Sequence, residues 1–238
     1  MKRPTLTLAL ALTLCTASPA RAYIDYVPLM ATGAWQANTA SYMKKWSRYV
    51  DARKVHANAA TPTSSTPQPA PSATVLMPAA GPSSVPAEMA AAYPAAQRAE
   101  IERAFRELLS GSRKIEQQFG IPRDDMAGAV AALIAGSWMA YRNRDFPDAN
   151  FKPLVLQMRA ILASNPGFRS ASAEEKRETF DRMVILGTFM ATLQMAQKQR
   201  PDPRVAANTR DAARGYLEQF LQTDADRIEL TAQGLQLR

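Results

Sequence analysis

The stretch DDMAGAVAALIAGSWMAYRNRD, residues 124–145, decides the fold of this chain. Its uncharged part, Met126 to Tyr141, would form a helix of about 24 Å, shorter than the roughly 30 Å hydrocarbon layer of a bilayer. Small residues recur at every fourth position and would lie on one row, which lets another helix approach closely. The row comprises Gly128, Ala132, Gly136 and Ala140. The stretch therefore predicts the central helix of a folded domain rather than a membrane span.

Four further segments of residues 94–238 place apolar residues at helical spacing. The run from Met183 to Ala196 carries no charge, whereas the other three segments have one apolar face each. Ser172 with Glu175 forms a capping box ahead of that run. We expect an all-α fold: a single five-helix domain, orthogonal or bundle-like, with two buried central helices wrapped by three amphipathic ones. The tail after residue 227 alternates apolar and polar residues, which indicates an extended strip without a partner strand.

Four runs of the chain resemble a family of uncharacterised exported bacterial proteins with a helical domain of unknown function. They are AGAVAALIAGSWMAYRN (127–143), LVLQMRAILASNPGF (154–168), EEKRETFDRMVILGTFM (174–190) and GYLEQFLQTDADRIELTAQGL (215–235). The resemblance covers about residues 120–235. It implies an exported helical protein, and it brings no activity, cofactor or catalytic residue to transfer.

Residues 1–22 have the features of a secretory signal peptide. Lys2 and Arg3 precede an apolar run, and Ala20-Arg21-Ala22 offers small residues for cleavage after Ala22. We therefore expect a periplasmic or secreted protein. Cleavage would remove the single cysteine and lower the formal charge from +8 to +5, because three basic residues and no acid are lost. That excess is too small and diffuse to predict nucleic-acid binding.

Residues 23–56 and 57–93 differ sharply in composition. The second segment is rich in Pro, Ala, Ser and Thr and holds one charged residue, Glu88, which predicts a disordered linker. The first segment combines aromatic and basic residues at near-helical spacing over residues 31–56, which predicts a short amphipathic helix.

Two interpretations of this amphipathic helix stay open. It docks on an anionic membrane surface or polymer, or its apolar stripe folds back onto the main domain and leaves the charges in water. The docking residues would be Trp35, Tyr42, Lys44, Lys45, Trp46 and Arg48.

The chain offers few residues for catalysis, and we predict no catalytic residue, metal site or cofactor. The one histidine, His56, lies at the edge of the predicted linker, where no rigid scaffold would hold it. The carboxylate pairs Asp124/Asp125 and Glu174/Glu175 stand at helix starts, where capping explains them. Only Glu107 or Glu116, meeting an acid from another helix, leaves a route to hydrolysis.

One polar cluster at the end of the quoted helix is a candidate binding site. Aromatic rings beside guanidinium groups suit a carboxylate, a sugar or an acidic side chain of a partner. The alternative is that the arginines complement the helix dipole while the tryptophan fills the core. The candidate residues are Trp138, Tyr141, Arg142, Arg144 and Asp145.

These features predict a non-enzymatic binding protein of the bacterial envelope, whose partner is an unidentified envelope protein or polymer. A cell-wall hydrolase that uses carboxylates alone is the first alternative. A membrane-active protein that inserts the glycine-row helix is the second.

Overall fold

The computed structural model describes residues 33–50, 54, 69–79 and 81–238, with the backbone alone for residues 33–38. The signal peptide predicted over residues 1–22 lies outside the described residues. The helices are α3 (Gly33–Ser47), α5 (Val85–Ala90), α6 (Arg98–Gln118), α7 (Met126–Arg142), α8 (Phe151–Ala163), α9 (Pro166–Ser170), α10 (Ala173–Gln199) and α11 (Pro203–Leu221), and the strands are β1 (Ile228–Thr231) and β2 (Gly234–Leu237).

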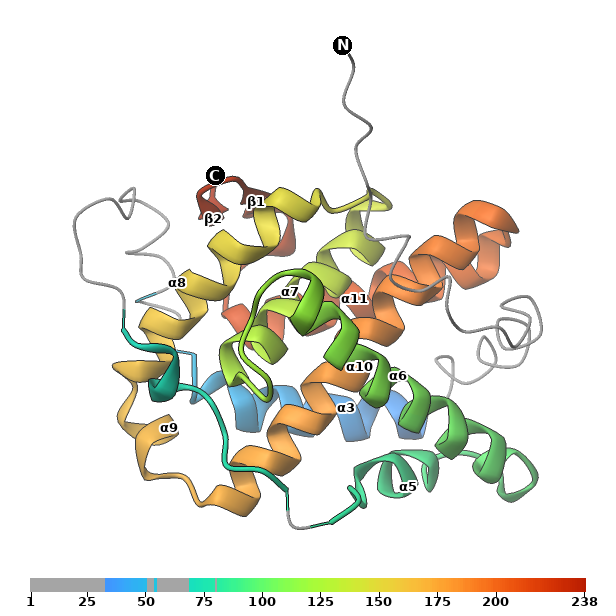
Figure 1. The fold of residues 1–238 in the computed structure, drawn as a ribbon. Helices are drawn as coiled ribbons and strands as arrows, with labels where there is room; N and C mark the ends of the chain where they lie inside the picture. The colour runs from blue at the N-terminus through green and yellow to red at the C-terminus, as the bar shows by residue number, and fades with distance from the viewer. Residues whose placement is uncertain (1–32, 51–53, 55–68, 80) are drawn as a thin grey trace.

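Helices α7 and α10 form the centre of this structure (Figure 1). Nearly all of α7 is buried, because its side chains are apolar or small on every face. The carboxylate of Asp125 caps α7 by accepting a hydrogen bond of 3.0 Å from the backbone N–H of Ala127. Ser172 caps α10 in the same way, through the N–H of Glu175 at 3.1 Å. Both the mostly helical fold and the two buried central helices are therefore confirmed.

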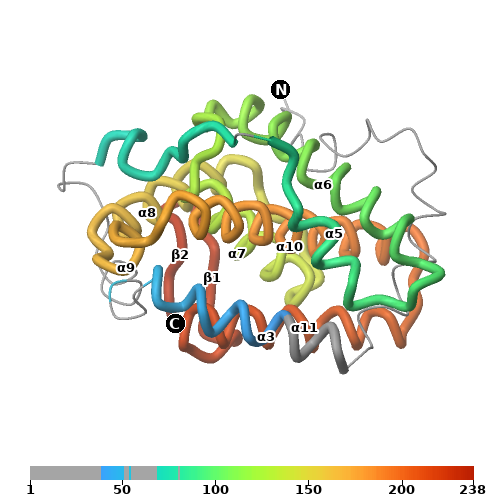
Figure 2. The backbone as a smooth tube through the Cα atoms, turned by 90° about the horizontal axis from the view of Figure 1, so that it is seen from below, coloured from blue at the N-terminus to red at the C-terminus, as the bar shows by residue number. Residues whose placement is uncertain are grey.

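The three amphipathic helices α6, α8 and α11 surround this pair, as their single apolar faces predicted. Helix α3 runs alongside α11 on one side of α10, and α6 lies on the other side (Figure 2). Four apolar residues at the end of α3 and just beyond it are buried in the same core as α7. They are Met43, Trp46, Tyr49 and Val50. The structure thus shows the fold-back of this segment, because its apolar stripe finds a partner surface in the main domain.

Residues 69–79 and 81–93 of the predicted linker pack against the domain. Val75 and Asp125 form an antiparallel bridge, in which the N–H of Met126 donates to the carbonyl of Thr74 and the N–H of Leu76 donates to the carbonyl of Asp124, each at 3.0 Å. Helix α5 buries Val85 and Met89 against the domain. These scattered apolar side chains anchor the segment, although its average composition is that of a tether. Residues 57–68 of the predicted linker lie outside the described residues.

The C-terminal strip is a two-stranded antiparallel hairpin rather than an extended strip without a partner. Its own two halves supply the pairing, with Ile228 opposite Leu237 and Thr231 opposite Gly234. The side chain of Gln157 on α8 continues the pairing, because its Oε1 accepts from Leu235 N–H at 2.7 Å and its Nε2 donates to the Leu235 carbonyl at 3.0 Å. The hairpin is therefore fastened to α8.

Among the helices of the described residues, none combines the length and the apolarity needed to cross a bilayer.

Candidate functional site

Helix α7 ends in a turn that presents its last polar side chains to one side. Asn143 adopts a left-handed conformation, with φ of 48°, and its N–H bonds to the carbonyl of Met139. Trp138 and Tyr141 lie one turn apart before this cap, and both are buried. Arg142 lies in the chain between these buried rings and the left-handed cap at Asn143, which together fix its position.

The hairpin is held against this end of α7 by three donors. Trp138 Nε1 donates to the carbonyl of Ile228 at 3.2 Å, and Tyr141 Oη donates to Asp226 at 2.7 Å. Arg142 donates to the backbone carbonyl of Asp226 at 2.7 Å and lies 3.5 Å from the carboxylate of Glu229. Burial, and next the hydrogen bond to Asp226, raises the pKa of Tyr141, while that bond lowers the pKa of Asp226.

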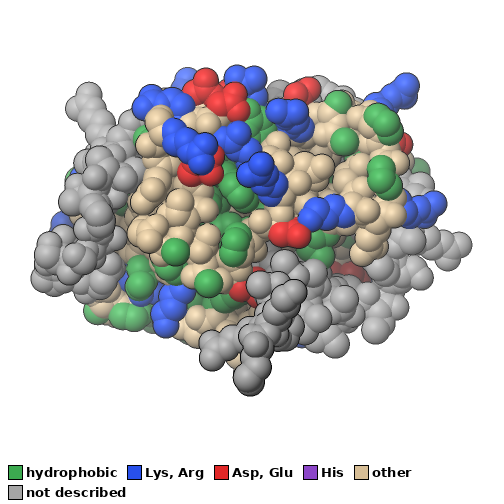
Figure 3. Space-filling model, turned by 90° about the horizontal axis from the view of Figure 1, so that it is seen from above, with side chains coloured by type: hydrophobic (Ala, Val, Ile, Leu, Met, Phe, Trp, Pro, Cys, Tyr) green, Lys and Arg blue, Asp and Glu red, His purple; other side chains and the backbone are tan. Residues whose placement is uncertain are grey.

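A pocket of about 760 Å³ opens beside this junction, between the ends of α7 and α10, the start of α11 and the hairpin. Its lining holds five basic side chains and one acidic side chain. These are Arg142, Arg144, Lys198, Arg210 and Arg238, with Glu229. In Figure 3, Lys and Arg side chains gather with a few acidic ones on part of the face that is seen from above. The lining therefore carries an excess of basic side chains, although Lys198 pairs with Asp145 and both Arg142 and Arg238 lie near Glu229.

Four of the five residues proposed from the sequence line this pocket: Trp138, Tyr141, Arg142 and Arg144. The fifth, Asp145, does not line it but pairs with Lys198, which does, at 2.6 Å. The structure therefore brings this predicted cluster together. The alternative interpretation also holds for part of it, since Trp138 fills core space and Arg142 holds the hairpin.

Sequence reasoning missed the side of the pocket that comes from α10 and α11. Gln194 on α10 is 2% exposed, and neither atom of its amide has a hydrogen-bond partner among the described residues. It lines the pocket together with Thr209 and Arg210 of α11. The available signal in the sequence is an amide side chain within the uncharged run from Met183 to Ala196.

The residues predicted to dock on a surface are mostly engaged within the domain. Trp46 is 1% exposed, so its ring is not available to an outside surface. Tyr42 is half-buried and lies under the guanidinium of Arg182, 4.1 Å from it. Lys45 and Arg48 both face Glu175, and Lys44 is exposed. The backbone of Trp35 belongs to α3, but its side chain is outside the described ones.

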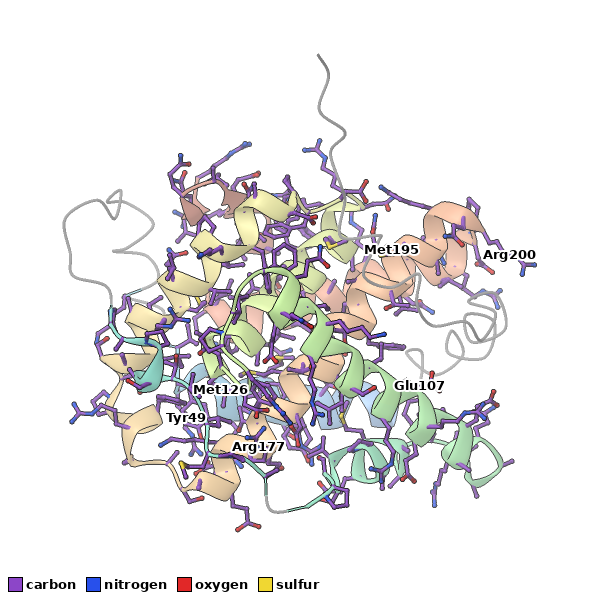
Figure 4. The ribbon with its side chains drawn as sticks, in the orientation of Figure 1. Tyr49, Glu107, Met126, Arg177, Met195 and Arg200 are labelled. Atoms are coloured by element: carbon purple, nitrogen blue, oxygen red, sulfur yellow. The ribbon has the colours of Figure 1, made fainter. Side chains whose placement is uncertain are left out.

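A buried polar cluster lies at the opposite end of α7. Asp125 is fully buried, and its carboxylate binds Arg159 at 2.5 Å and the hydroxyl of Thr74 at 2.6 Å. Asp124 binds Arg177, which also donates to the carbonyl of Met77 at 2.7 Å. Figure 4 shows Arg177 and Met126 on this side of the molecule, whereas Glu107 lies on α6, away from both.

Glu116 is the predicted carboxylate that does meet acids from outside its own helix. Its Oε1 accepts from the backbone N–H of Asp124 at 3.1 Å. Burial, together with the charges of Asp124 and Asp125, raises the pKa of Glu116 to about 7. Glu174 and Glu175 stand in the first turn of α10, as capping predicted. Among the described residues, no group of three His, Cys, Asp or Glu side chains is placed to hold a metal ion.

The fold and pocket define a helical protein with two buried central helices and a basic pocket at one end of them. The chain belongs to the family of unknown function DUF6683, whose model matches residues 1–238. No curated protein and no solved structure matches it. The resemblance to a family of unknown function is thus confirmed and extends beyond residues 120–235 to the whole chain. Export from a bacterial cell stays a prediction.

Proposed function

We propose that this protein is an exported, non-enzymatic binding protein of the bacterial envelope, and that it captures anionic groups in the basic pocket. The observation that carries the proposal is the lining, in which five basic side chains face one carboxylate around the rings of Trp138 and Tyr141. Aromatic and guanidinium groups together recognise carboxylates by charge, planar hydrogen bonding and stacking.

The cations of the lining differ in how far the fold already uses them, since Arg238 pairs with Glu229 and Lys198 pairs with Asp145. Arg144 and Arg210 are exposed, whereas Arg142 is occupied by the hairpin. The guanidinium of Arg210 lies 5.4 Å from the centre of the Tyr141 ring, which orients it at the pocket wall. An envelope polymer or protein that carries carboxylates is the partner this arrangement favours.

The test is binding of soluble peptidoglycan fragments with free carboxylates, followed by the indole N–H resonance of Trp138. We expect the R144E/R210E double variant to lose roughly tenfold or more in affinity, since it reverses two lining charges. The matched control is K114E/K152E, which makes the same charge change on α6 and α8 away from the pocket. Equal loss in both variants would show a diffuse charge effect, and no binding of any anion would refute the proposal.

Localisation is tested separately by cell fractionation and N-terminal sequencing of the protein in its host. A mature chain that begins at Tyr23 supports export with cleavage after Ala22. A cytoplasmic chain that begins at residue 1 contradicts it.

A hydrolase that uses carboxylates is the second candidate, and the raised pKa of Glu116 beside Asp124 favours it. In that role protonated Glu116 would be the acid and Asp124 the second carboxylate. Release of reducing ends from peptidoglycan, lost in E116Q and retained in E107Q, would support this candidate. Absence of release by the wild-type protein excludes that activity.

A further inference from the structure

The side chain of Gln194 is the least explained polar group of the pocket. It lies on α10, 2% exposed, with both amide atoms buried and without a hydrogen-bond partner in the part of the chain that the structure describes. Buried amides are nearly always hydrogen-bonded, because burial removes their hydrogen bonds to water and no protein group replaces them if they stay unpaired. This unpaired amide therefore costs stability, and a ligand that pairs with it would recover that cost.

The pocket around Gln194 offers two kinds of contact to a ligand: attraction by charge and hydrogen bonding to a neutral amide. The basic side chains of the lining attract negative charge, whereas the neutral amide adds no charge: its NH2 can donate to a carboxylate, but a carboxylate offers no donor for its C=O. Along one edge, the side-chain amide of a glutamine presents an N–H donor and a C=O acceptor. That edge matches the N–H and the carboxyl-side C=O of a single residue, as the amide of Gln157 does with Leu235, whereas a simple carboxylate offers acceptors alone.

The neighbouring Gln197 differs from Gln194, because its side-chain amide does have a hydrogen-bond partner. Gln197 also lines the pocket from α10, but its Oε1 accepts from the backbone N–H of Asp202 at 3.0 Å. That bond joins the end of α10 to the start of α11, where Asp202 caps the next helix. Of two glutamines three residues apart, one is used by the fold.

We propose that the pocket takes ligands in which an amide stands next to a carboxylate, as at the free C-terminal residue of a short peptide. Gln194 pairs with the amide, and the arginines of the lining hold the carboxylate. The inference rests on the proposed function and narrows it from anions in general to acylated amino acids.

Three small probes test the proposal on the wild-type protein. N-acetylalanine carries both groups, N-acetylalaninamide lacks the charge, and propionate lacks the amide. We expect N-acetylalanine to bind about tenfold or more tightly than either of the others. It should also shift the side-chain amide resonances of Gln194, whereas propionate should leave them in place.

Two matched variants separate a ligand contact from a structural role. Q194M should abolish the preference for N-acetylalanine over propionate and raise the melting temperature, because it removes an unpaired buried amide at nearly constant shape. Q197M should lower the melting temperature and keep the preference, because it breaks the bond to Asp202.

The outcomes divide cleanly. If propionate binds as tightly as N-acetylalanine, the amide inference is wrong and the anion pocket stands. If no probe binds, the inference and the proposed function both fail. A lower melting temperature in Q194M, with the preference retained, shows that Gln194 serves the fold and overturns the inference. If Q194M does not fold, the shift of the Gln194 amide resonances in the wild-type protein still tests whether Gln194 contacts the ligand.

Discussion

Gly136 of α7 and Gly187 of α10 lie face to face at the point where the two central helices are closest. A Cβ atom on Gly136 would come 2.0 Å from the carbonyl oxygen of Gly187, and a Cβ atom on Gly187 would come 2.5 Å from the backbone of Ala132. Both are backbone contacts that no side-chain rotation relieves. Ala132 and Gly136, the middle of the row of small residues seen in the sequence, thus lie where α7 and α10 pack.

The first prediction is that G136A and G187A each destabilise the protein by about 2–4 kcal/mol, because the two helices must move apart to admit a methyl group. Urea unfolding followed by circular dichroism measures the change. G111A is the matched control, since a Cβ atom at this helical position on α6 would meet nothing within 4 Å. It should stabilise by about 0.5–1 kcal/mol through helix propensity. Destabilisation of similar size in all three variants would contradict a close crossing.

The second prediction concerns the buried pair of Asp125 and Arg159. D125N should cost about 3–5 kcal/mol of unfolding free energy, because it leaves a guanidinium buried without its counter-charge. E218Q is the control, since Glu218 forms an exposed pair with Arg214 on α11 and should cost about 0.5 kcal/mol or less. Chemical denaturation measures both. A cost for D125N no larger than that for E218Q would show that this pair contributes little.

The third prediction is a pH dependence that comes from Glu116. Its pKa is raised from 4.5 to about 7 in the folded protein, so between these values the folded chain holds a proton that the unfolded chain releases. This contribution to stability is present in full below pH 4.5 and is lost as the pH rises through 7. E116Q should therefore be more stable than the wild type at pH 8, by about 1 kcal/mol once its partial exposure is allowed for.

The control for this pH dependence is E107Q on the same helix. Its side chain is exposed, so the variant should follow the wild-type stability profile across the pH range. Thermal unfolding at pH 5 and pH 8 measures the difference for each variant. If E116Q loses as much stability as the wild type between these pH values, Glu116 is not the group responsible.

The fourth prediction separates the core role of α3 from surface docking. W46A should cost about 3–5 kcal/mol, because the ring is 1% exposed in the core. M77A is the control, since Met77 is 78% exposed and its removal should change stability little. Vesicle flotation with anionic lipid is the second measurement. Retained stability of W46A together with loss of flotation would favour docking over fold-back.

Local sequence patterns predicted most of the helices and their caps. Apolar spacing and capping residues define helices from within a few residues, so all five predicted helices of residues 94–238 and the caps at Asp125 and Ser172 are present. The polar end of α7 was found for the same reason, because Trp138, Tyr141 and Arg142 follow one another on one helix.

What escaped prediction depends on contacts between segments far apart in the chain. Gln194 and Arg210 join the pocket only because α10 and α11 pack beside the end of α7. The course of residues 69–79 and 81–93 depends on single anchors such as Thr74 and Met89, whose effect is lost in an average over the composition. The hairpin escaped because each half was judged alone, although Gly234, with φ of 95°, marks the turn between them.

The pairing of α3 with α11 has a consequence for how the chain reaches its native state. These helices lie on either side of residues 48–202 in the chain, so their contact closes a long loop. Closing long loops costs chain entropy and slows folding, whereas α7, α8 and α10 are near neighbours along the chain and meet early. During synthesis α11 emerges long after α3, so the contact between these two helices forms late in folding.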